Sequence, residues 1–395
     1  MKLASRISEL EPSDIRNVMK IIAANPGTIS MASGALDPKL YPTEAIAAST
    51  DRILKQEPGL ALSYGMTLGR LELREQIAKL MVREGVSCTK DQIMVTTGSQ
   101  QGLSLAAQLF CDPGDLIVTE NPSYLGALSA FKPHEVNYAG IDGNDEGMDL
   151  EALEKYLKSN KKVKAIYLVP NFQNPTGKTW TKERRQGLLD IAYKYDLPII
   201  EDNAYGELRY EGERVPSFMS LDTKGQVIHL GSFSKILSPG LRVGWMAASS
   251  DLINKLEMLK YGADLQSVEL TQMIVTDLLT HNDIDEHLDN IKAVYKKRRD
   301  AMLKAIQEEF PPGVHYIKPE GGMFVWVELP EYIDTKDLLN QSVERKVAYV
   351  PGQSFYPDES KTNTMRLNFS AMEEDKISEG VQILGRLIRE LIAQN

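Results

Sequence analysis

The stretch Gly231-Ser232-Phe233-Ser234-Lys235 follows a short apolar run, Val227-Ile228-His229-Leu230, and precedes the turn-forming pair Pro239-Gly240. The apolar run predicts a buried strand, so Lys235 is expected on a loop just past a strand end, where α/β proteins place their chemistry. Two serine hydroxyls and the guanidinium of Arg242 lie close by in sequence, and this set suits an anion, most simply a phosphate. A lysine near another cation has a lowered pKa, and its neutral amine can attack a carbonyl. By itself, the stretch is equally compatible with a solvated surface lysine beside a serine-rich turn.

The length, composition and charge of the chain are those of an ordinary globular protein. The chain has 395 residues, of which 42% are hydrophobic and 25% charged, and its formal net charge is −10. This length predicts about two domains. The acidic balance argues against a nucleic-acid partner, which needs a basic face on the protein. No apolar run is long enough to cross a membrane, and the first residues lack the apolar core of a signal peptide.

The cysteines and histidines give no sign of a metal site. Cys88 and Cys111 form no metal-type pair, and the five histidines show no metal-ligand spacing. We therefore expect no bound metal and a reduced, cytoplasmic protein.

Short apolar strands alternate with helical segments through the first two thirds of the chain. Strands are predicted over residues 93–97, 116–119, 135–138, 165–169, 198–201, 227–230 and 243–247. This alternation predicts an α/β fold with a mostly parallel sheet covered by helices on both faces, which makes a three-layer large domain.

We expect three parts in the chain. Residues 1–44 form an N-terminal segment that packs near the active site and the small domain, residues 45–275 the large α/β domain, and residues 276–395 a smaller α+β domain. A single long helical region is predicted from Leu270 to about Phe310. Its basic run, Lys296-Lys297-Arg298-Arg299, is expected to form a solvated helix face.

Two further stretches suit a phosphorylated ligand. Gly98-Ser99-Gln100-Gln101-Gly102 lies where a strand gives way to a helix, and free N–H groups at a helix start bind anions. Asn174-Pro175-Thr176-Gly177 follows the strand over 165–169 and has the composition of an ordinary turn. Both stretches also have a purely structural explanation, as turns between elements.

Single side chains at strand ends complete the set. Asp202 ends the strand over 198–201, with Tyr205 three residues later, and Tyr124 follows the strand over 116–119. Arg366 lies between apolar residues of a C-terminal strand, where an arginine is rarely buried without an anionic partner. An anion cup, a turn amide, an acid with a phenol, a lysine and an arginine together suit a phosphorylated aromatic aldehyde.

In order and spacing, these motifs resemble those of the class I and II aminotransferases, the pyridoxal 5′-phosphate enzymes of fold type I. The resemblance covers nearly the whole chain and rests on Asn174-Pro175-Thr176-Gly177, Asp202-x-x-Tyr205, Ser232-x-Ser234-Lys235, Arg242 and Arg366. Residues 169–177, Val-Pro-Asn-Phe-Gln-Asn-Pro-Thr-Gly, resemble the branch that contains 2-aminoadipate and kynurenine aminotransferases.

The resemblance implies a role for each motif. Lys235 would form the Schiff base with the cofactor and then move the proton between Cα and C4′. Asp202 would pair with the pyridinium nitrogen, and Tyr205 and Asn174 would hydrogen-bond to O3′ of the ring. Tyr124 would stack on the ring. The remaining implied cofactor contacts are the phosphate ligands Ser99, Gln100, Ser232, Ser234 and Arg242, with Tyr64 reaching the phosphate bound in the partner subunit of a homodimer.

The resemblance also implies a substrate site. Arg366 would take the α-carboxylate, with Asn174 and Gly34 beside it. The segment Ser33-Gly34-Ala35 departs from the branch, which often has two adjacent glycines there. Arg16, on a predicted helix over 13–22, is a candidate for the side-chain carboxylate of glutamate or 2-aminoadipate, although a single arginine on such a helix is usually solvent-facing.

Other functions remain open on sequence alone. A pyridoxal-phosphate-dependent lyase or decarboxylase would use the same lysine and cofactor contacts. A non-catalytic regulator with a DNA-binding domain is disfavoured, because the family-like region begins within the first forty residues. A NAD-dependent enzyme is disfavoured because no G-x-G-x-x-G motif follows a strand.

Overall fold

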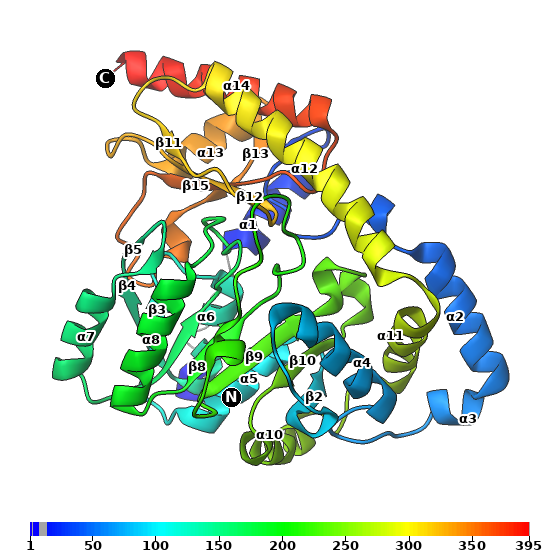
Figure 1. The fold of residues 1–395 in the computed structure, drawn as a ribbon. Helices are drawn as coiled ribbons and strands as arrows, with labels where there is room; N and C mark the ends of the chain where they lie inside the picture. The colour runs from blue at the N-terminus through cyan, green and yellow to red at the C-terminus, as the bar shows by residue number, and fades with distance from the viewer. Residues whose placement is uncertain (2, 8–13, 395) are drawn as a thin grey trace.

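The computed structural model describes residues 1, 3–7 and 14–394. Among these residues two sheets stand out, a large one in the middle of the chain and a smaller one in its last third (Figure 1). No helix in the described ranges is both long and apolar enough to serve as a membrane span.

The large sheet has seven strands in the order β2-β10-β9-β8-β7-β3-β4. Six of them run parallel, and β10 is antiparallel to both its neighbours. In that order the strands are Ile93–Thr96, Gly244–Ala247, Val227–Ser232, Ile199–Asp202, Val163–Leu168, Leu116–Glu120 and Asn137–Ile141. All but the edge strand β4 are almost continuously buried, because helices cover both faces.

Alternate residues of each strand serve different layers of the core. On β8, Ile200 packs with the layer formed by α5 (Ser99–Phe110), α6 (Leu125–Phe131) and α10 (Ser250–Ala263). Its neighbour Ile199 packs with the opposite layer. That layer includes α4 (Leu71–Met81), α7 (Leu150–Ser159), α8 (Lys182–Tyr195), α9 (Phe218–Leu221) and α11 (Glu269–His281). The predicted α/β fold with three layers is confirmed.

The second sheet has the strand order β11-β12-β15-β14. These strands are His315–Tyr316, Phe324–Glu328, Thr364–Asn368 and Val350–Pro351. They pack with α13 (Thr335–Glu344) and α14 (Glu374–Gln394), and α12 (Ile284–Glu309) runs from beside α11 to this sheet (Figure 1).

The N-terminal part of the chain joins this second unit. After α1 (Asp14–Ala24), β1 (Ile29–Ser30) pairs in parallel with β13 (Val347–Ala348). The chain then returns to the large sheet through α2 (Thr43–Gln56) and α3 (Pro58–Ala61). Residues far apart in sequence therefore meet between the two sheets.

Two predicted elements differ from the structure. The single helical region from Leu270 to Phe310 is two helices, because the chain turns at Asn282 and the Asp283 carboxylate caps α12 by accepting from Asp285 N at 2.9 Å. The strand predicted over 135–138 begins two residues later, as β4, because Glu135 ends a 3₁₀ turn in the left-handed region with φ 57°.

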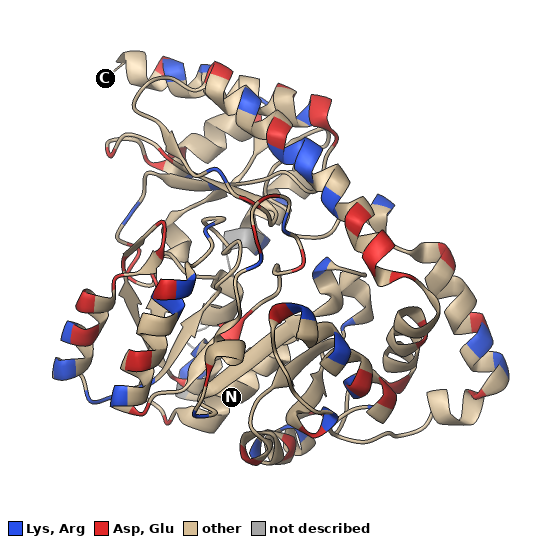
Figure 2. Cartoon of the chain, viewed as in Figure 1, with Lys and Arg blue, Asp and Glu red and all other residues tan. Residues whose placement is uncertain are grey.

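The prediction that Lys296-Lys297-Arg298-Arg299 forms a solvated helix face is wrong for both arginines. Arg298 and Arg299 are 2% and 0% exposed. Arg298 Nη1 donates to Asp37 Oδ2 at 2.7 Å, and Arg299 Nη2 donates to Glu211 Oε1 at 2.6 Å. Their partners lie in distant segments, so helical periodicity gives no sign of them. Along the outer faces of α12 and α14, basic and acidic residues are interspersed (Figure 2).

The Arg298–Asp37 pair gives a test of this packing. Arg298→Met should lower the free energy of unfolding by about 3–5 kcal/mol, because it leaves the 5%-exposed Asp37 carboxylate buried without its cation. Chemical denaturation measures the loss. The adjacent exposed residue supplies the control, since Lys297→Met should change stability by less than about 0.5 kcal/mol. Equal losses in the two variants would contradict this role for the pair.

Candidate active site

The parallel strands β7, β8 and β9 bring three predicted residues to one edge of the large sheet. Asn174 lies on the loop after β7, Asp202 is the last residue of β8, and Lys235 lies in a 3₁₀ turn, Phe233–Lys235, directly after β9. The carboxyl ends of parallel strands face the same side, which is where open α/β sheets bind ligands.

Asp202 is a buried acid that is only half satisfied. It is 3% exposed, and the Tyr167 hydroxyl donates to its Oδ2 at 3.1 Å. Its other oxygen, Oδ1, is buried and has no hydrogen-bond partner among the described residues. Burial raises the pKa of Asp202 to about 6, against the Tyr167 hydrogen bond and the charges of His229 and Lys235, which lower it. The unpaired oxygen therefore suits a cationic N–H donor from a ligand.

Lys235 is partly buried in the same region. Its Nζ donates to the carbonyl of Gly34 at 2.6 Å and lies 6.0 Å from the centre of the Tyr205 ring. Burial and the nearby cations Arg366 and Arg242 together lower the pKa of Lys235 to about 8, against the charge of Asp202, which raises it. Near neutral pH a useful fraction of this amine is therefore uncharged and nucleophilic.

Asn174 links two other candidates. Arg366 Nη1 donates to Asn174 Oδ1 at 2.8 Å, and Asn174 Nδ2 donates to the Tyr205 hydroxyl at 3.3 Å. Asn174 and Tyr205 are 3% and 5% exposed. Burial raises the pKa of the Tyr205 phenol, so this hydroxyl stays protonated and can donate a hydrogen bond.

Arg366 is a buried cation that has no carboxylate partner among the described residues. It lies on β15, is 1% exposed, and Nη2 donates to the carbonyl of Ala32 at 2.9 Å. Its guanidinium lies 4.2 Å from the Phe324 ring centre and 5.3 Å from that of Phe355. Burial lowers its pKa to about 10, and its Nε has no partner among the described residues. A buried guanidinium whose described hydrogen-bond partners are all neutral is suited to bind an anionic ligand such as a carboxylate.

An anion cup forms beside these groups where α5 begins. Gly98 precedes α5 with φ 73°, and a Cβ at this position would collide with the guanidinium of Arg242. Arg242 Nη2 donates to the carbonyl of Thr97 at 3.1 Å, which holds the cation next to the N–H groups of the helix start. Ser99 is the first residue of α5 and Gln100 the second.

The serines of the lysine stretch are also buried. Ser232 and Ser234 are 5% and 8% exposed, and the Ser232 hydroxyl accepts from Ser234 N at 3.1 Å. Gly244 joins this stretch to the cup, because a Cβ there would meet both the Ser99 N–H and the carbonyl of Gly231. Gln100 turns its side chain elsewhere, since Nε2 donates to the carbonyl of Gly126 at 2.7 Å.

Tyr124 lies close to the charged groups, at the start of α6. Burial and the charge of Asp202 raise the pKa of Tyr124 to about 12, against the charges of Arg366 and Arg242, which lower it. The glycine two residues later has no room for a Cβ because the Tyr124 ring fills the space. The ring position is thus fixed by its own helix.

Two predicted residues lie outside this cluster in the single chain. Tyr64, between α3 and α4, is 84% exposed. Arg16 lies on α1 with an exposed side chain. Gly34, in contrast, is inside the cluster, with 3.5 Å between the position of a Cβ and the Phe324 ring.

Sequence reasoning missed several groups that contact the cluster. Tyr167 lies within the strand predicted over 165–169, and its hydroxyl donates to Asp202. Its position near the carboxyl end of that strand was the signal that could have identified it. Gly34 was predicted, but the hydrogen bond that its carbonyl accepts from Lys235 was not, and Ala32 was not predicted at all, because a backbone carbonyl has no side-chain signature.

Known proteins are similar to this chain in sequence and in fold. The model of the family "Aminotransferase class I and II" matches residues 27–384. The aromatic-amino-acid aminotransferase 1 of Thermococcus litoralis is 46% identical over 386 residues, covering 96% of this chain and 92% of that protein. The 2-aminoadipate transaminase of Thermus thermophilus is 38% identical over 387 residues, covering 97% and 96%. Among solved structures, the kynurenine aminotransferase of Pyrococcus horikoshii matches with TM-score 0.94 at 43% identity, covering 99% of this chain and 97% of that one.

These matches span nearly the whole chain. The chain therefore belongs to the class I and II aminotransferases, a family of fold type I pyridoxal 5′-phosphate enzymes, and its relatives include 2-aminoadipate and kynurenine aminotransferases.

Proposed function

We propose that this chain transfers the amino group of an L-amino acid to a 2-oxo acid such as 2-oxoglutarate, in a ping-pong cycle with pyridoxal 5′-phosphate held at Lys235. The observation that carries the proposal is the pairing of a lysine whose pKa is lowered to about 8 with a buried acid, Asp202, that has one unpaired oxygen. The solved P. horikoshii relative is described in complex with PMP, kynurenine and its product, which supports the same cofactor here.

The residues present fit this cofactor. Asp202 Oδ1 lacks a donor, and a protonated ring nitrogen supplies one. The Gly98 position has no room for a Cβ beside Arg242, which leaves backbone N–H groups and a guanidinium facing one place, as a phosphate requires. The phosphate contacts would come from Ser99, from Gln100 through its backbone N–H, and from Ser232, Ser234 and Arg242. The O3′ contacts would come from Asn174 and Tyr205.

When bound, pyridoxal phosphate supplies an electron sink that stabilises negative charge at the substrate Cα. Asp202 keeps the ring nitrogen protonated, because a carboxylate buried beside that nitrogen favours the charged pair over two neutral groups. Lys235 holds the cofactor and later carries the proton between Cα and C4′, for which a pKa near working pH is suitable. Arg366 orients the α-carboxylate, and Tyr124 covers the ring.

Cofactor loading gives a pH test of Lys235. Covalent loading of cofactor-free protein should speed up with pH, by about tenfold per pH unit below about 8, and then level off, because only the uncharged amine attacks the aldehyde and its pKa is about 8. Absorbance of the newly formed Schiff base measures the rate. Lys235→Ala should show no covalent loading. A rate that is independent of pH over this range would contradict the assigned role.

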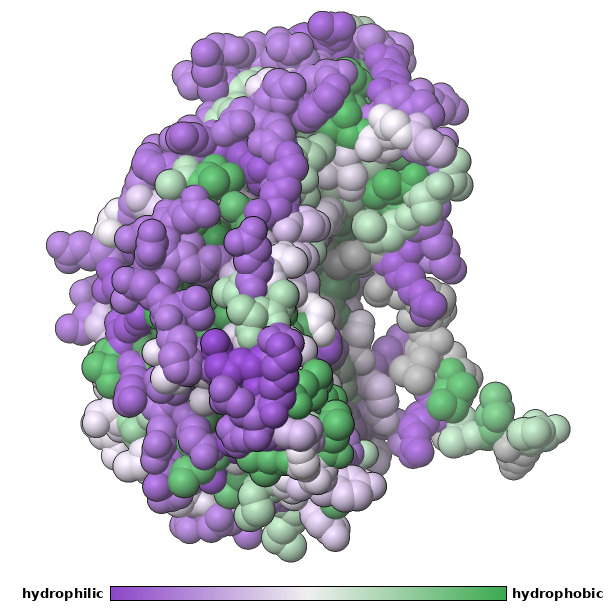
Figure 3. All heavy atoms as spheres, turned by 90° about the vertical axis from the view of Figure 1, so that its right-hand side faces the viewer, coloured by the Kyte–Doolittle hydropathy of each residue, from purple (hydrophilic) through white to green (hydrophobic). Residues whose placement is uncertain are grey.

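We also propose a homodimer with shared active sites in the cytoplasm. The exposed large hydrophobic residues Leu62, Tyr64 and Met66 lie in the segment after α3, at 73%, 84% and 68% exposure. Val268, at 59% exposure, neighbours this segment, because Gly65 N donates to the side chain of Gln266. Figure 3 looks onto the side where α2 and α3 lie and shows hydrophobic patches there. Such exposed residues are typical of an interface. Both cysteines among the described residues are free thiols, which supports the proposed location in the reducing cytoplasm.

Shared sites can be tested by mixing inactive subunits. Tyr64→Ala lacks the phosphate contact donated across the interface, and Lys235→Ala lacks the nucleophile of its own site. Hybrid dimers would contain one intact site, so activity should recover to about a quarter of wild type after subunit exchange. Each variant alone is the control. A protein that sediments as a monomer and is fully active would contradict the proposal of shared active sites.

For the substrate, we propose a set that includes glutamate and 2-aminoadipate, with Arg16 binding the side-chain carboxylate. The named activity of the T. thermophilus relative supports this choice, while that of the T. litoralis relative supports aromatic amino acids as well. A broad specificity is compatible with both, because Arg366 binds the α-carboxylate that all amino acids share.

The Arg16 assignment predicts a selective loss. Arg16→Ala should lower kcat/KM for glutamate and 2-aminoadipate by about tenfold to a hundredfold, which is the effect of one charge-assisted contact, and spare leucine and kynurenine. Steady-state kinetics with the four substrates measures this. An equal loss on all four would make Arg16 a structural residue.

A further inference from the structure

The loop over residues 169–180 carries Asn174 and is tightly closed. Residues 169–177 are buried throughout, although a loop usually runs over the surface. Its two ends are joined by Trp180 N, which donates to the carbonyl of Pro170 at 2.9 Å. Nearer the tip, Gln173 N donates to the carbonyl of Lys178 at 2.8 Å. The loop is therefore a preformed unit that needs an attachment to the sheet.

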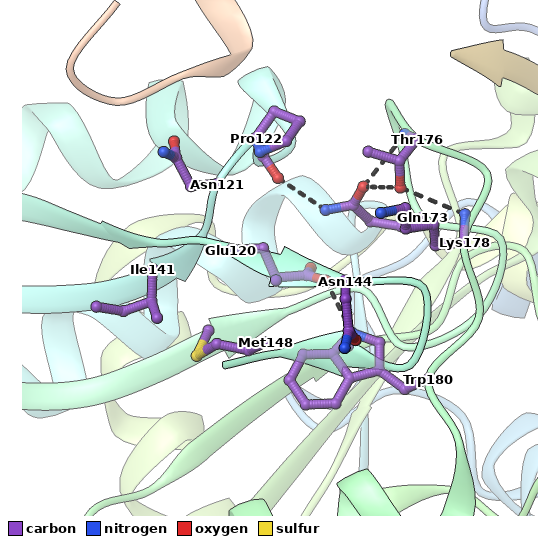
Figure 4. Close-up of a pocket in the computed structure, with 12 residues that line it drawn as sticks. Glu120, Asn121, Pro122, Ile141, Asn144, Met148, Gln173, Thr176, Lys178 and Trp180 are labelled. Carbon is purple, nitrogen blue, oxygen red and sulfur yellow. Dashed lines mark hydrogen bonds between the residues drawn. The ribbon is translucent and has the colours of Figure 1, made fainter. Parts of the chain in front are cut away.

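Glu120, the last residue of β3, provides that attachment. It is 9% exposed, its Oε2 accepts from Val169 N, and its Oε1 accepts from Trp180 Nε1, both at 2.8 Å. One carboxylate thus holds the first and the last residue of the loop. In the view of Figure 4, Glu120 lies between Gln173 and the Trp180 ring.

A second contact continues from the same strand end to Asn174. Gln173 Nε2 donates to the carbonyl of Pro122 at 2.8 Å, two residues beyond Glu120. The side-chain amide of the next residue, Asn174, is hydrogen-bonded to Arg366 and Tyr205. A shift of the loop relative to β3 would pull Asn174 away from both.

We propose that Glu120 is a positioning residue for the transamination site, which fixes Asn174 against Arg366 by clamping both ends of the loop over 169–180 to β3. The inference rests on the proposed function only for its kinetic consequence. Nothing in the sequence motifs assigns Glu120, because the segment Val118-Thr119-Glu120 reads as an ordinary strand end.

The clamp requires a carboxylate rather than an amide. Two N–H donors converge on Glu120, and a glutamine has only one oxygen to accept them, so its NH₂ would face a donor. Burial raises the pKa of Glu120 to about 7, while the hydrogen bonds from Val169, Trp180 and Gln173 and the charge of Lys178 lower it. The anion therefore depends on the same donors that it holds.

Glu120→Gln is the sharpest substitution. An alanine would be less informative, because an adjoining cavity of about 40 Å³, lined by Glu120, Asn121 and Trp180, has room for a water that could replace the carboxylate. Trp180→Phe removes the second donor but keeps an aromatic ring against Phe218, whose centre lies 5.7 Å away. Asp222→Asn is the matched control, since Asp222 also closes a turn by accepting from Val227 N and Lys224 N, at 2.8 Å each, but at the opposite end of β9 from Ser232.

In the holoenzyme, Glu120→Gln should lower kcat/KM about tenfold or more for every amino acid, mainly through KM, because Arg366 loses its oriented neighbour. A crystal structure of the variant should show the Arg366 Nη1–Asn174 Oδ1 distance lengthened from 2.8 Å to beyond hydrogen-bond range. Trp180→Phe should act in the same direction, and the double variant should lose no more than Glu120→Gln alone, since both act on one contact. Asp222→Asn should lower stability and leave KM unchanged.

Either of two results would overturn the proposal. One is a Glu120→Gln enzyme with wild-type KM and Asn174 in place. The other is a double variant whose losses are additive. If Glu120→Gln does not fold, Trp180→Phe carries the same test. Hydrogen exchange of residues 169–180 in the absence of substrate should be faster in both variants than in wild type, and this readout tests the clamp even if the wild-type enzyme proves to have no aminotransferase activity.

Discussion

A carboxylate buried at the end of β8 is the constraint on which the site depends. Asp202 is 3% exposed, yet the only described donor to it is the Tyr167 hydroxyl, and its second oxygen is unpaired. An ion in such a position is costly unless a positive partner compensates it. In the protein alone, Lys235 and His229 supply part of that compensation through their charges. A cationic ring nitrogen would complete it, so the burial of this acid costs stability in the protein alone and would favour binding of the cofactor.

The other groups are arranged around this acid by segments that are distant in sequence. Gly34 and Ala32 come from the N-terminal segment, Asn174 and Lys235 from the large sheet, and Arg366 from the small one. The Arg298–Asp37 pair holds the N-terminal segment against α12. Arg366 and Lys235 thus belong to different sheets, and the packing of the two units determines how far apart these residues lie.

The sequence predicted the large sheet well, because its strands are continuous apolar runs separated by helices with clear amphipathic spacing. The strand-end residues Asn174, Asp202 and Lys235 followed from that, since parallel strands bring their carboxyl ends to one edge. The basic run on α12 was misjudged because Asp37 and Glu211, which neutralise its arginines, are brought there only by tertiary folding. Short strands such as β5 (Gly143–Asn144) and β6 (Gly147–Met148) were missed, because two residues carry no periodicity.

The contributions of backbone groups were also beyond sequence reasoning. The carbonyl that accepts from Lys235 belongs to a glycine, and no residue type marks a carbonyl as an acceptor. Glu120 illustrates the same limit for a side chain, because its hydrogen bonds to Val169 and Trp180 are visible only once a loop about fifty residues later folds back onto its strand. Motifs therefore identified the side chains proposed to bind the ligands, while the groups that hold those side chains in place became visible only in the structure.

One half-reaction tests the central claim most directly. Holoenzyme mixed with glutamate in the absence of any 2-oxo acid should convert its bound cofactor to pyridoxamine 5′-phosphate and release an equimolar amount of 2-oxoglutarate, both measurable by chromatography of the denatured mixture. This result would show that the amino group is stored on the enzyme between two substrates, as transamination requires. Release of carbon dioxide or ammonia, with the cofactor still in its aldehyde form, would contradict the account and make the chain a decarboxylase or a lyase.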